Sequence, residues 1–316
     1  GAFSLTQQCV QLRYCPRVTI VHTSRAEAGQ IYIPEVNTAL MVGCLLLVVG
    51  FGSSGALGGA YGIAVTGTMA ATTVLFCVLA RERWQWSVWR IGTLGAVFLG
   101  IDLAFFGANL TKVTLGGWVP LAIAAGLFLL MSTWNRGTEL LNRLLLEAAV
   151  PVEQFLAEVE REKPPRVAGT GVFMTAHGER VPLVLQRHLR HNKALQREVI
   201  LLAVVTEDVP EVDEAKRLTL EALPQGLYRA RAHYGFMERP DVRELVARCR
   251  DHGLEAPEED TTYYLGRMRI MPTGPAPMMG WRKRLFSLMA RNSSSLPDFF
   301  RIPPDRVVEL GARIEF

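Results

Sequence analysis

Four long apolar stretches dominate the first 134 residues of the chain. They cover residues 38–51, 58–80, 88–106 and 116–131, and Arg90 and Asp102 are the only charged side chains in them. A helix needs roughly 20 apolar residues to cross a bilayer, so the first stretch spans one only if it continues into 52–57. A buried helix of a water-soluble protein would instead show a polar face. The pattern predicts an integral membrane protein with four transmembrane helices, at about 36–56, 58–80, 88–106 and 116–134.

The remaining residues follow a different pattern. The chain opens with what reads as the end of a further helix and a cytoplasmic loop, over 1–35. After residue 134, a leucine-rich amphipathic helix is expected within a linker at 135–165, which ends at two prolines. Short apolar strands then alternate with helices, and the run 198–206 (EVILLAVVT) is typical of a central strand. The sequence therefore predicts a small cytosolic α/β domain at 166–316, and the chain is interpreted as the C-terminal portion of a longer protein.

Charge predicts the orientation of the membrane helices. Arg81, Arg83 and Arg90 flank the middle loop, and basic residues also precede the first helix and follow the fourth. The loops at 52–57 and 107–115 contain no charged residue except Lys112. Because Lys and Arg favour the cytoplasmic side, both ends and the middle loop are expected inside. Tryptophans at the ends of the runs fit the two membrane interfaces.

Composition excludes several function classes. Residues after 134 hold 27 of the 34 basic and 26 of the 30 acidic residues, interspersed, which argues against a nucleic-acid polymer as partner. The five cysteines contain no C-x-x-C pair, and no phosphate-binding, dinucleotide-binding or hydrolase signature is present. His188 and His191 could share a helix face, but a solvated basic face is the favoured interpretation. The sequence predicts neither an enzyme, a cofactor nor a resident metal.

One stripe of polar residues crosses the second apolar stretch. Tyr61, Thr68 and Thr72 are spaced by seven and four residues, which places them on one helix face. Neutral hydroxyl and carbonyl oxygens suit a large cation that sheds its water, such as K⁺. The alternative is that these hydroxyls bond back to their own helix. The neighbouring glycines, including a G-x-x-x-G motif, are expected to serve close helix packing.

Asp102 is the only acid inside an apolar stretch. An intramembrane carboxylate is costly, so a functional role is the default hypothesis. Its expected position near the outer end of its helix, close to Asn109 and Lys112, equally favours a structural contact at the outer rim. Both interpretations stay open.

An amphipathic helix is also expected at 281–291. Trp281, Leu285, Leu288 and Met289 are expected to form one apolar face beside Arg282, Lys283 and Arg284. Such a helix either lies at the lipid headgroups or packs on the sheet or on a partner subunit.

Short motifs along the whole chain resemble those of the KUP (KUP/HAK/KT) potassium uptake permeases. The matching stretches are GAFSLTQQCVQL (1–12), VHTSRAEAGQIYIPEVN (21–37), GAYGIAVTGTM (59–69), NLTKVTLGGWVPL (109–121), MSTWNRG (131–137), GTGVFM (169–174), HNKALQREVILLAVVTEDVP (191–210), HYGFMERPDV (233–242) and RNSSSLPDFFRIPPDRVVELGARIEF (291–316).

The resemblance implies the inverted-repeat fold of amino acid–polyamine–cation transporters followed by a cytosolic domain. It implies K⁺ uptake across the inner membrane, with H⁺ as coupling ion, and a tail that regulates or forms a homodimer; tails of some relatives bind a cyclic dinucleotide. The family's main cation-site helices have no counterpart in this chain. Tyr61 matches the family tyrosine that closes the cation site from outside, and Thr66 and Thr68 belong to the same motif.

Two alternatives remain from the sequence. The first is an amino-acid permease of the same superfamily. The second is a membrane-anchored regulatory or binding module whose α/β domain is the functional part.

Overall fold

The computed structural model describes residues 1–22, 31–175, 179–235, 237–238, 240–251, 253–254, 256–293 and 300–316. The chain divides into two compact units, which are treated separately here. One unit comprises Glu35–Leu130, and the other comprises Gly1–Pro34 together with Met131–Phe316. Parts of three resembling stretches, at 23–30, 236, 239 and 294–299, lie outside the described residues, as does Arg25 of the basic entry segment.

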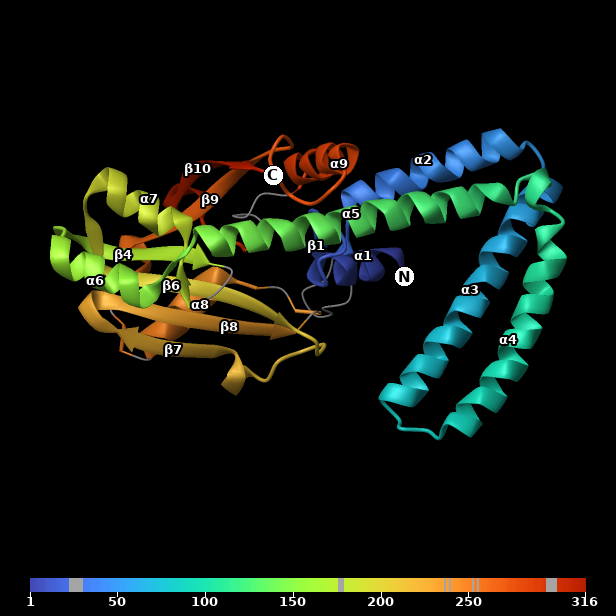
Figure 1. Ribbon diagram of the computed structural model, residues 1–316, viewed down its shortest axis with the longest axis horizontal. Coiled ribbons are helices and arrows are strands. Elements are labelled where there is room, and N and C mark those ends of the chain that lie inside the picture. Colours follow the sequence, from blue (N-terminus) through green and yellow to red (C-terminus); the bar gives the residue numbers. More distant parts are fainter. Residues whose placement is uncertain are drawn as a thin grey trace. The chain divides into compact units, whose positions relative to one another are not determined.

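Long apolar helices make up the first unit. They are α2 (Pro34–Phe51), α3 (Ser54–Glu82), α4 (Val88–Leu110) and the first part of α5 (Trp118–Ala148), and all four are long and apolar enough to cross a membrane (Figure 1). Apolar side chains such as Leu46 point outward, with 68% of the surface exposed, and α2 has no buried residue. This arrangement suits a lipid environment. The prediction of four membrane helices is confirmed.

The boundary between α2 and α3 differs from the prediction. The first helix was expected to continue to about residue 56, but α2 ends at Phe51. Gly52 follows with φ +60°, a left-handed conformation that ends a helix and favours glycine. Ser53 then caps α3, because its hydroxyl accepts a hydrogen bond from the Ala56 amide at 3.4 Å. The 18 residues of α2 give a length of about 27 Å, close to the hydrocarbon thickness of a bilayer.

The expected linker helix at 135–165 is also replaced by a different arrangement. The fourth membrane helix continues without interruption to Ala148, because no proline occurs between Pro120 in its first turn and Pro151. A short strand, β3 (Val150–Pro151), then pairs with β5 (Arg180–Val181), and a separate helix, α6, spans Val152–Glu162. Lys163 ends α6 in a left-handed conformation, and the two prolines prevent its continuation.

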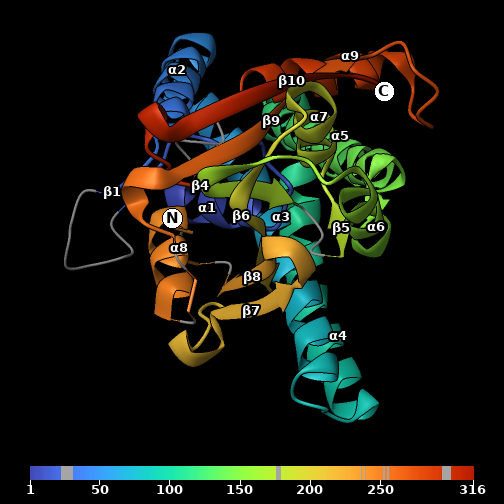
Figure 2. The same ribbon diagram turned by 90° about the vertical axis from the view of Figure 1, so that its left-hand side faces the viewer.

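The second unit contains a six-stranded sheet. Its strands are β4 (Arg166–Thr175), β6 (Leu195–Glu207), β7 (Leu218–Leu223), β8 (Leu227–Gly235), β9 (Thr261–Met271) and β10 (Val307–Glu315). Their order is β10-β9-β4-β6-β8-β7, and every pair is parallel except β7–β8 (Figure 2). The predicted α/β domain and the central position of 198–206 are confirmed.

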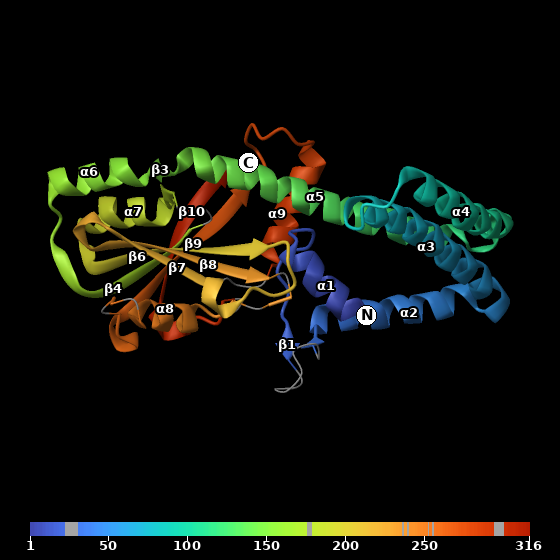
Figure 3. The same ribbon diagram turned by 90° about the horizontal axis from the view of Figure 1, so that it is seen from below.

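Helices cover both faces of this sheet. α6 and α7 (Leu183–Asn192) pack on one face around Phe173, Leu201 and Tyr264. On the other face, α8 (Val242–Asp251) packs around Ile200, Leu202 and Tyr263 (Figure 3). Alternate residues of each strand point to opposite faces, which is why neighbouring apolar residues of β6 belong to two cores.

The helix expected at 240–252 begins two residues late, at Val242. The Asp241 carboxylate accepts hydrogen bonds from the amides of Arg243 and Glu244 at the start of this helix.

A third apolar cluster joins α5 to the C-terminal helix α9 (Gly280–Arg291). Phe286 packs against Leu140 of α5 and against Phe316. Lys283, Phe286 and Ser287 are the buried residues of α9, whereas Trp281 and Leu288 are exposed. The predicted apolar face of this helix is therefore not its buried face. Phe286 decides the orientation because its ring fills the space beside Gly137.

His188 also differs from its expected position on a solvated face. It is buried rather than solvated, and its ring lies edge-on to Phe173 and Tyr264 at centroid distances of 5.5 and 4.7 Å. Burial lowers the pKa of its imidazole. Its Nδ1 lies 2.9 Å from Asn192 Nδ2, whereas His191 is exposed. Among the described residues, no group of three His, Cys, Asp or Glu side chains could hold a metal ion.

Candidate functional site

The predicted polar stripe lines one hollow on the surface of α3 and α4. Tyr61, Thr68 and Thr72 of α3 border a cavity of about 570 Å³, and Asp102 of α4 borders it from the other helix. Tyr61 is 71% exposed, so its phenol is accessible from this hollow. The structure therefore brings together four of the five predicted site residues.

Thr66 is the predicted residue that does not reach this hollow. It lies on another side of α3 and is buried, with its hydroxyl donating to the Gly62 carbonyl at 2.7 Å. Its position in the GAYGIAVTGTM motif placed it near Thr68 in sequence, but two residues in a helix are separated by 200°. In this structure Thr66 belongs to the helix packing and not to the hollow.

Two threonine hydroxyls at the hollow, those of Thr68 and Thr72, are bonded to the backbone of their own helix. Thr68 donates to the Ala64 carbonyl and Thr72 to the Thr68 carbonyl, both at 2.8 Å. This is the alternative that sequence reasoning had kept open. These hydroxyls could still bind a cation, because a hydroxyl that donates its only proton retains acceptor lone pairs. The bonds fix each proton on the helix side and leave those lone pairs available to a cation.

Asp102 makes its contact with α3. The Thr73 hydroxyl donates to Asp102 Oδ2 at 2.5 Å, and the aspartate is only 5% exposed. Asn109 and Lys112, its expected neighbours, contact each other instead, with Lys112 Nζ 3.4 Å from Asn109 Oδ1. Sequence reasoning missed Thr73, although its position next to Thr72 on a helix facing an intramembrane acid was a usable signal.

Small residues allow α3 and α4 to approach closely. A Cβ added to Gly62 would lie 2.5 Å from Asn109 Oδ1, and one added to Gly95 would lie 2.9 Å from Cys77 Sγ. Both distances are too short for real contacts, so any larger residue would displace the Asn109 or Cys77 side chain. The predicted packing role of the α3 glycines is supported by Gly62.

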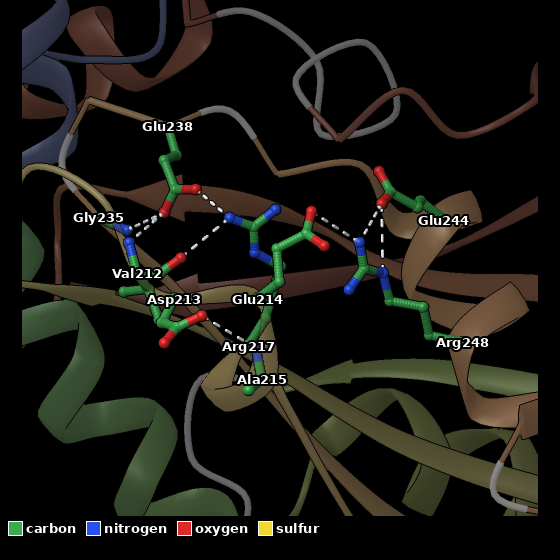
Figure 4. Close-up of polar contacts among 9 residues, drawn as sticks. All are labelled: Val212, Asp213, Glu214, Ala215, Arg217, Gly235, Glu238, Glu244 and Arg248. Atoms are coloured by element: carbon green, nitrogen blue, oxygen red, sulfur yellow. Dashed lines mark hydrogen bonds and ion pairs between the residues drawn. The ribbon is translucent and has the colours of Figure 1, made fainter.

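Glu238 anchors a polar cluster at the C-terminal end of β8, in the second unit (Figure 4). Its carboxylate accepts from the Gly235 amide at 2.7 Å and from the Val212 amide at 3.0 Å, and it pairs with Arg217. The Arg217 guanidinium also donates to the Val212 carbonyl and lies 5.2 Å from the centre of the Tyr234 ring. The pair is largely buried, and its hydrogen bonds join the segment at 212–217 to the end of β8.

The N-terminal helix α1 (Ala2–Gln11) reaches the same loop. Gln11 Nε2 donates to the Glu238 carbonyl at 3.2 Å, and Gln7 Nε2 donates to the Met237 carbonyl at 3.4 Å. A second set of contacts joins α9 to α5, where Arg282 donates to the hydroxyls of Thr133 and Ser132 at 2.9 and 3.2 Å. These contacts connect the α/β domain to α1, which precedes the apolar helices in the sequence, and to residues 132 and 133 of α5. No sequence motif indicated them.

Comparison with protein families covers nearly the whole chain. The model of the K⁺ potassium transporter integral membrane domain matches residues 1–139, and that of the K⁺ potassium transporter C-terminal domain matches residues 168–316. The boundary falls within the segment of α5, β3 and α6, between the membrane helices and the sheet.

Curated relatives match over the full chain. "Probable potassium transport system protein Kup" of Anaeromyxobacter sp. (strain Fw109-5) is 52% identical over 100% of this chain and 48% of its own length. "Probable potassium transport system protein Kup 1" of Paramagnetospirillum magneticum is 49% identical over 100% of this chain and 49% of the relative. "Probable potassium transport system protein Kup 1" of Geobacter sulfurreducens is 48% identical, with 100% and 50% covered. The chain thus spans about half the length of these relatives. No solved structure matches it.

Proposed function

Because this chain belongs to the K⁺ potassium transporter family and is a multi-pass inner-membrane protein, we propose that the full-length protein imports K⁺ by secondary transport. The observation that carries the proposal is the match of both family domains, in order, to the membrane helices and the α/β domain. Alternating access around a site between helices is the usual mechanism of such folds. The distribution of Lys and Arg supports a cytoplasmic position for the α/β domain.

Within this chain, the α3 face at Tyr61, Thr68 and Thr72 is proposed to border the cation pathway. Its hollow offers one phenol and two threonine oxygens with free lone pairs, which match the neutral ligands that K⁺ accepts. Tyr61 is assigned the role of an outer gate, because its large exposed ring can cover or uncover the hollow by rotating about χ1. Thr66 is assigned to helix packing near this gate.

Symport with H⁺ is proposed as the energy source for uptake. Asp102 is the intramembrane acid of this chain, and its buried carboxylate already receives a hydrogen bond from Thr73. This bond connects α4 to α3. We assign Asp102 to the contact between the two helices and not to the essential proton step.

A transport assay separates this proposal from the amino-acid permease and the anchored module. The full-length protein should restore growth of a K⁺-uptake-deficient strain in low K⁺, and ⁸⁶Rb⁺ uptake should be competed by K⁺. A protonophore should reduce uptake at constant membrane potential if H⁺ is the coupling ion. Uptake of labelled amino acids without ⁸⁶Rb⁺ uptake would support the permease, and uptake of neither would support the anchored module.

The α/β domain is proposed to regulate or dimerise the transporter, through the contacts that α1 and α5 make with it. A cyclic dinucleotide is the regulator that the resemblance suggests, and a homodimer is the corresponding assembly. Full-length protein truncated after Ala148 should retain part of its ⁸⁶Rb⁺ uptake. If truncated protein that is correctly inserted shows none, the domain belongs to the transport machinery.

A further inference from the structure

Aromatic rings cluster in the short loop that joins α3 to α4 (Figure 1). Phe76 of α3 lies edge-on to Trp84 and Trp86, with ring centroids 5.7 and 6.1 Å away, and the two tryptophan rings lie 5.5 Å apart. The Trp86 amide donates to the Ala80 carbonyl at 3.0 Å, which holds the loop against the end of α3. Tryptophan rings favour the headgroup level of a bilayer. The cluster therefore indicates where this helix pair meets the membrane interface.

A groove of about 560 Å³ begins at this cluster and follows α4. It is lined by Trp86, Trp89, Arg90, Thr93 and Leu94. These residues are spaced so that they follow one face of the helix. Trp89 is 87% exposed and Leu94 is also exposed, so the groove is open to the surroundings. Its first part is aromatic and cationic and its last part is apolar, which is the order of headgroup and acyl chain in a phospholipid.

The positive charge near the groove is not balanced by the protein. Arg90 lines the groove, and Arg81 and Arg83 precede it at the end of α3 and in the loop. Among the described residues, none of these three exposed guanidinium groups forms an ion pair. Glu82 is the only acidic residue between positions 81 and 90. Guanidinium groups bind phosphate oxygens in pairs, and basic residues beside a membrane attract anionic lipids.

Other ligands match the groove less well. A soluble anion would pair with Arg90 but would leave the apolar end at Leu94 unfilled. A zwitterionic phospholipid would fill that end, but its headgroup has no net charge to balance the arginines. The groove also lies at the start of the apolar stretch 88–106, where acyl chains surround a membrane helix. Charge and polarity together favour an anionic phospholipid.

We propose that this groove binds one anionic phospholipid, with the phosphate at Arg90, the headgroup beside Trp89 and one acyl chain along Leu94. The bound lipid holds the α3–α4 loop at the membrane interface. The site is distinct from the hollow at Tyr61 and Thr68, because the two share no lining residue. The inference does not depend on which ion is transported, so lipid binding and transport can succeed or fail independently.

The test compares two double variants of the full-length protein in detergent. Trp89→Ala with Arg90→Gln alters the groove. Trp118→Ala with Lys112→Gln is the matched control, because it also removes one exposed tryptophan and one exposed basic residue, but from positions outside the groove. Native mass spectrometry measures the affinity of each protein for phosphatidylglycerol and for phosphatidylcholine with the same acyl chains.

The wild type should bind phosphatidylglycerol more tightly than phosphatidylcholine. The groove variant should bind phosphatidylglycerol about fivefold more weakly or less, because a basic residue at an anionic headgroup is lost. The control variant should keep the wild-type preference. Equal affinity of the wild type and the groove variant for phosphatidylglycerol overturns the proposal. An equal loss in both double variants also overturns it, because the binding would then reflect overall charge and not this groove.

A second measurement does not depend on the folding of the groove variant. Trp89→Phe keeps an aromatic ring, and the difference in fluorescence between the wild type and this variant reports on Trp89. In nanodiscs, phosphatidylglycerol with brominated acyl chains should quench this fluorescence more than brominated phosphatidylcholine at the same mole fraction, because the anionic lipid occupies the groove. Equal quenching by the two lipids overturns the proposal.

Discussion

The two units of this chain use the same apolar residues in opposite ways. In the unit Glu35–Leu130, leucines and phenylalanines point away from the helix pairs, while Asp102 and Thr73 meet between α3 and α4. In the other unit, Phe173 and Leu201 are buried and charged side chains such as Arg190 are exposed. Apolar side chains thus cover the surface of the membrane part and fill the interior of the α/β part, as the two solvents require. Exposed polar residues such as Tyr61 and Thr68 are exceptions on the apolar surface of the first unit, so function is expected at their hollow.

Truncation of one apolar residue in each unit gives the sharpest contrast. Phe173→Ala removes a fully buried ring that stacks on Tyr264 at 4.5 Å, so the α/β domain should lose about 3–5 kcal/mol of stability. Leu46→Ala changes a side chain that is 68% exposed on α2, so it should alter stability by no more than about 0.5 kcal/mol. Calorimetry of the full-length protein in detergent checks both. Equal losses in the two variants would contradict the difference in packing.

Thr68→Val tests whether a hydroxyl at the hollow contributes to cation binding. The variant keeps the side-chain shape and removes one oxygen, so the apparent KM for ⁸⁶Rb⁺ should rise about three- to tenfold with little change in the maximal rate. Thr93→Val on α4 is the matched control, because Thr93 bonds to its own helix at the same 2.8 Å and does not border the hollow. An unchanged KM in Thr68→Val would remove Thr68 from the pathway.

Asp102→Asn should have a smaller effect, with uptake reduced less than about twofold. Asparagine retains an oxygen that accepts from the Thr73 hydroxyl, so the contact between α3 and α4 survives. Asp102→Leu, which leaves that hydroxyl without its acceptor, should be worse. Initial rates of ⁸⁶Rb⁺ uptake, corrected for inserted protein, compare the two. Background uptake in Asp102→Asn would show that the charge itself is needed, as for a proton carrier.

The smallest expected effect is a pH dependence in the α/β domain. Burial lowers the pKa of His188 below the ordinary value of 6.5, so the folded domain binds fewer protons than the unfolded chain once the pH falls below that value. Stability should be fully present above pH 6.5 and decline on acidification until His188 itself protonates. His188→Gln should flatten this slope, whereas His191→Gln, an exposed control on the same helix, should leave it unchanged. Melting temperatures between pH 7.5 and 5.5 measure the slopes; identical slopes in all three proteins would exclude His188.

The pattern of hydrophobic residues predicted which segments form helices and which form strands, because both depend on local sequence. The apolar stretches that became α3 and α4 and the central strand β6 all followed from hydrophobicity alone. Boundaries failed where single residues decided them, as with Gly52 after α2 and Pro151 after α5. The face of α9 was wrong because Phe286 packs into the space left by Gly137, a contact between residues distant in sequence.

For the candidate site, the sequence predicted the residues that share one helix face but not the contacts between helices. Tyr61, Thr68 and Thr72 lie on one helix, so their common face followed from spacing. The Thr73–Asp102 bond depends on how α3 meets α4, which no spacing contains.

Uptake of ⁸⁶Rb⁺ by Tyr61→Ala in the full-length protein tests most directly whether the α3 face borders the cation pathway. Tyr61 is the largest exposed polar residue of the hollow, and Leu75→Ala, an exposed change on the same helix outside the hollow, is the control. The account predicts that uptake by Tyr61→Ala falls at least about tenfold, equivalent to about 1.4 kcal/mol, at an unchanged amount of inserted protein. Leu75→Ala should transport like the wild type. Wild-type kinetics in Tyr61→Ala would contradict the assignment of this face.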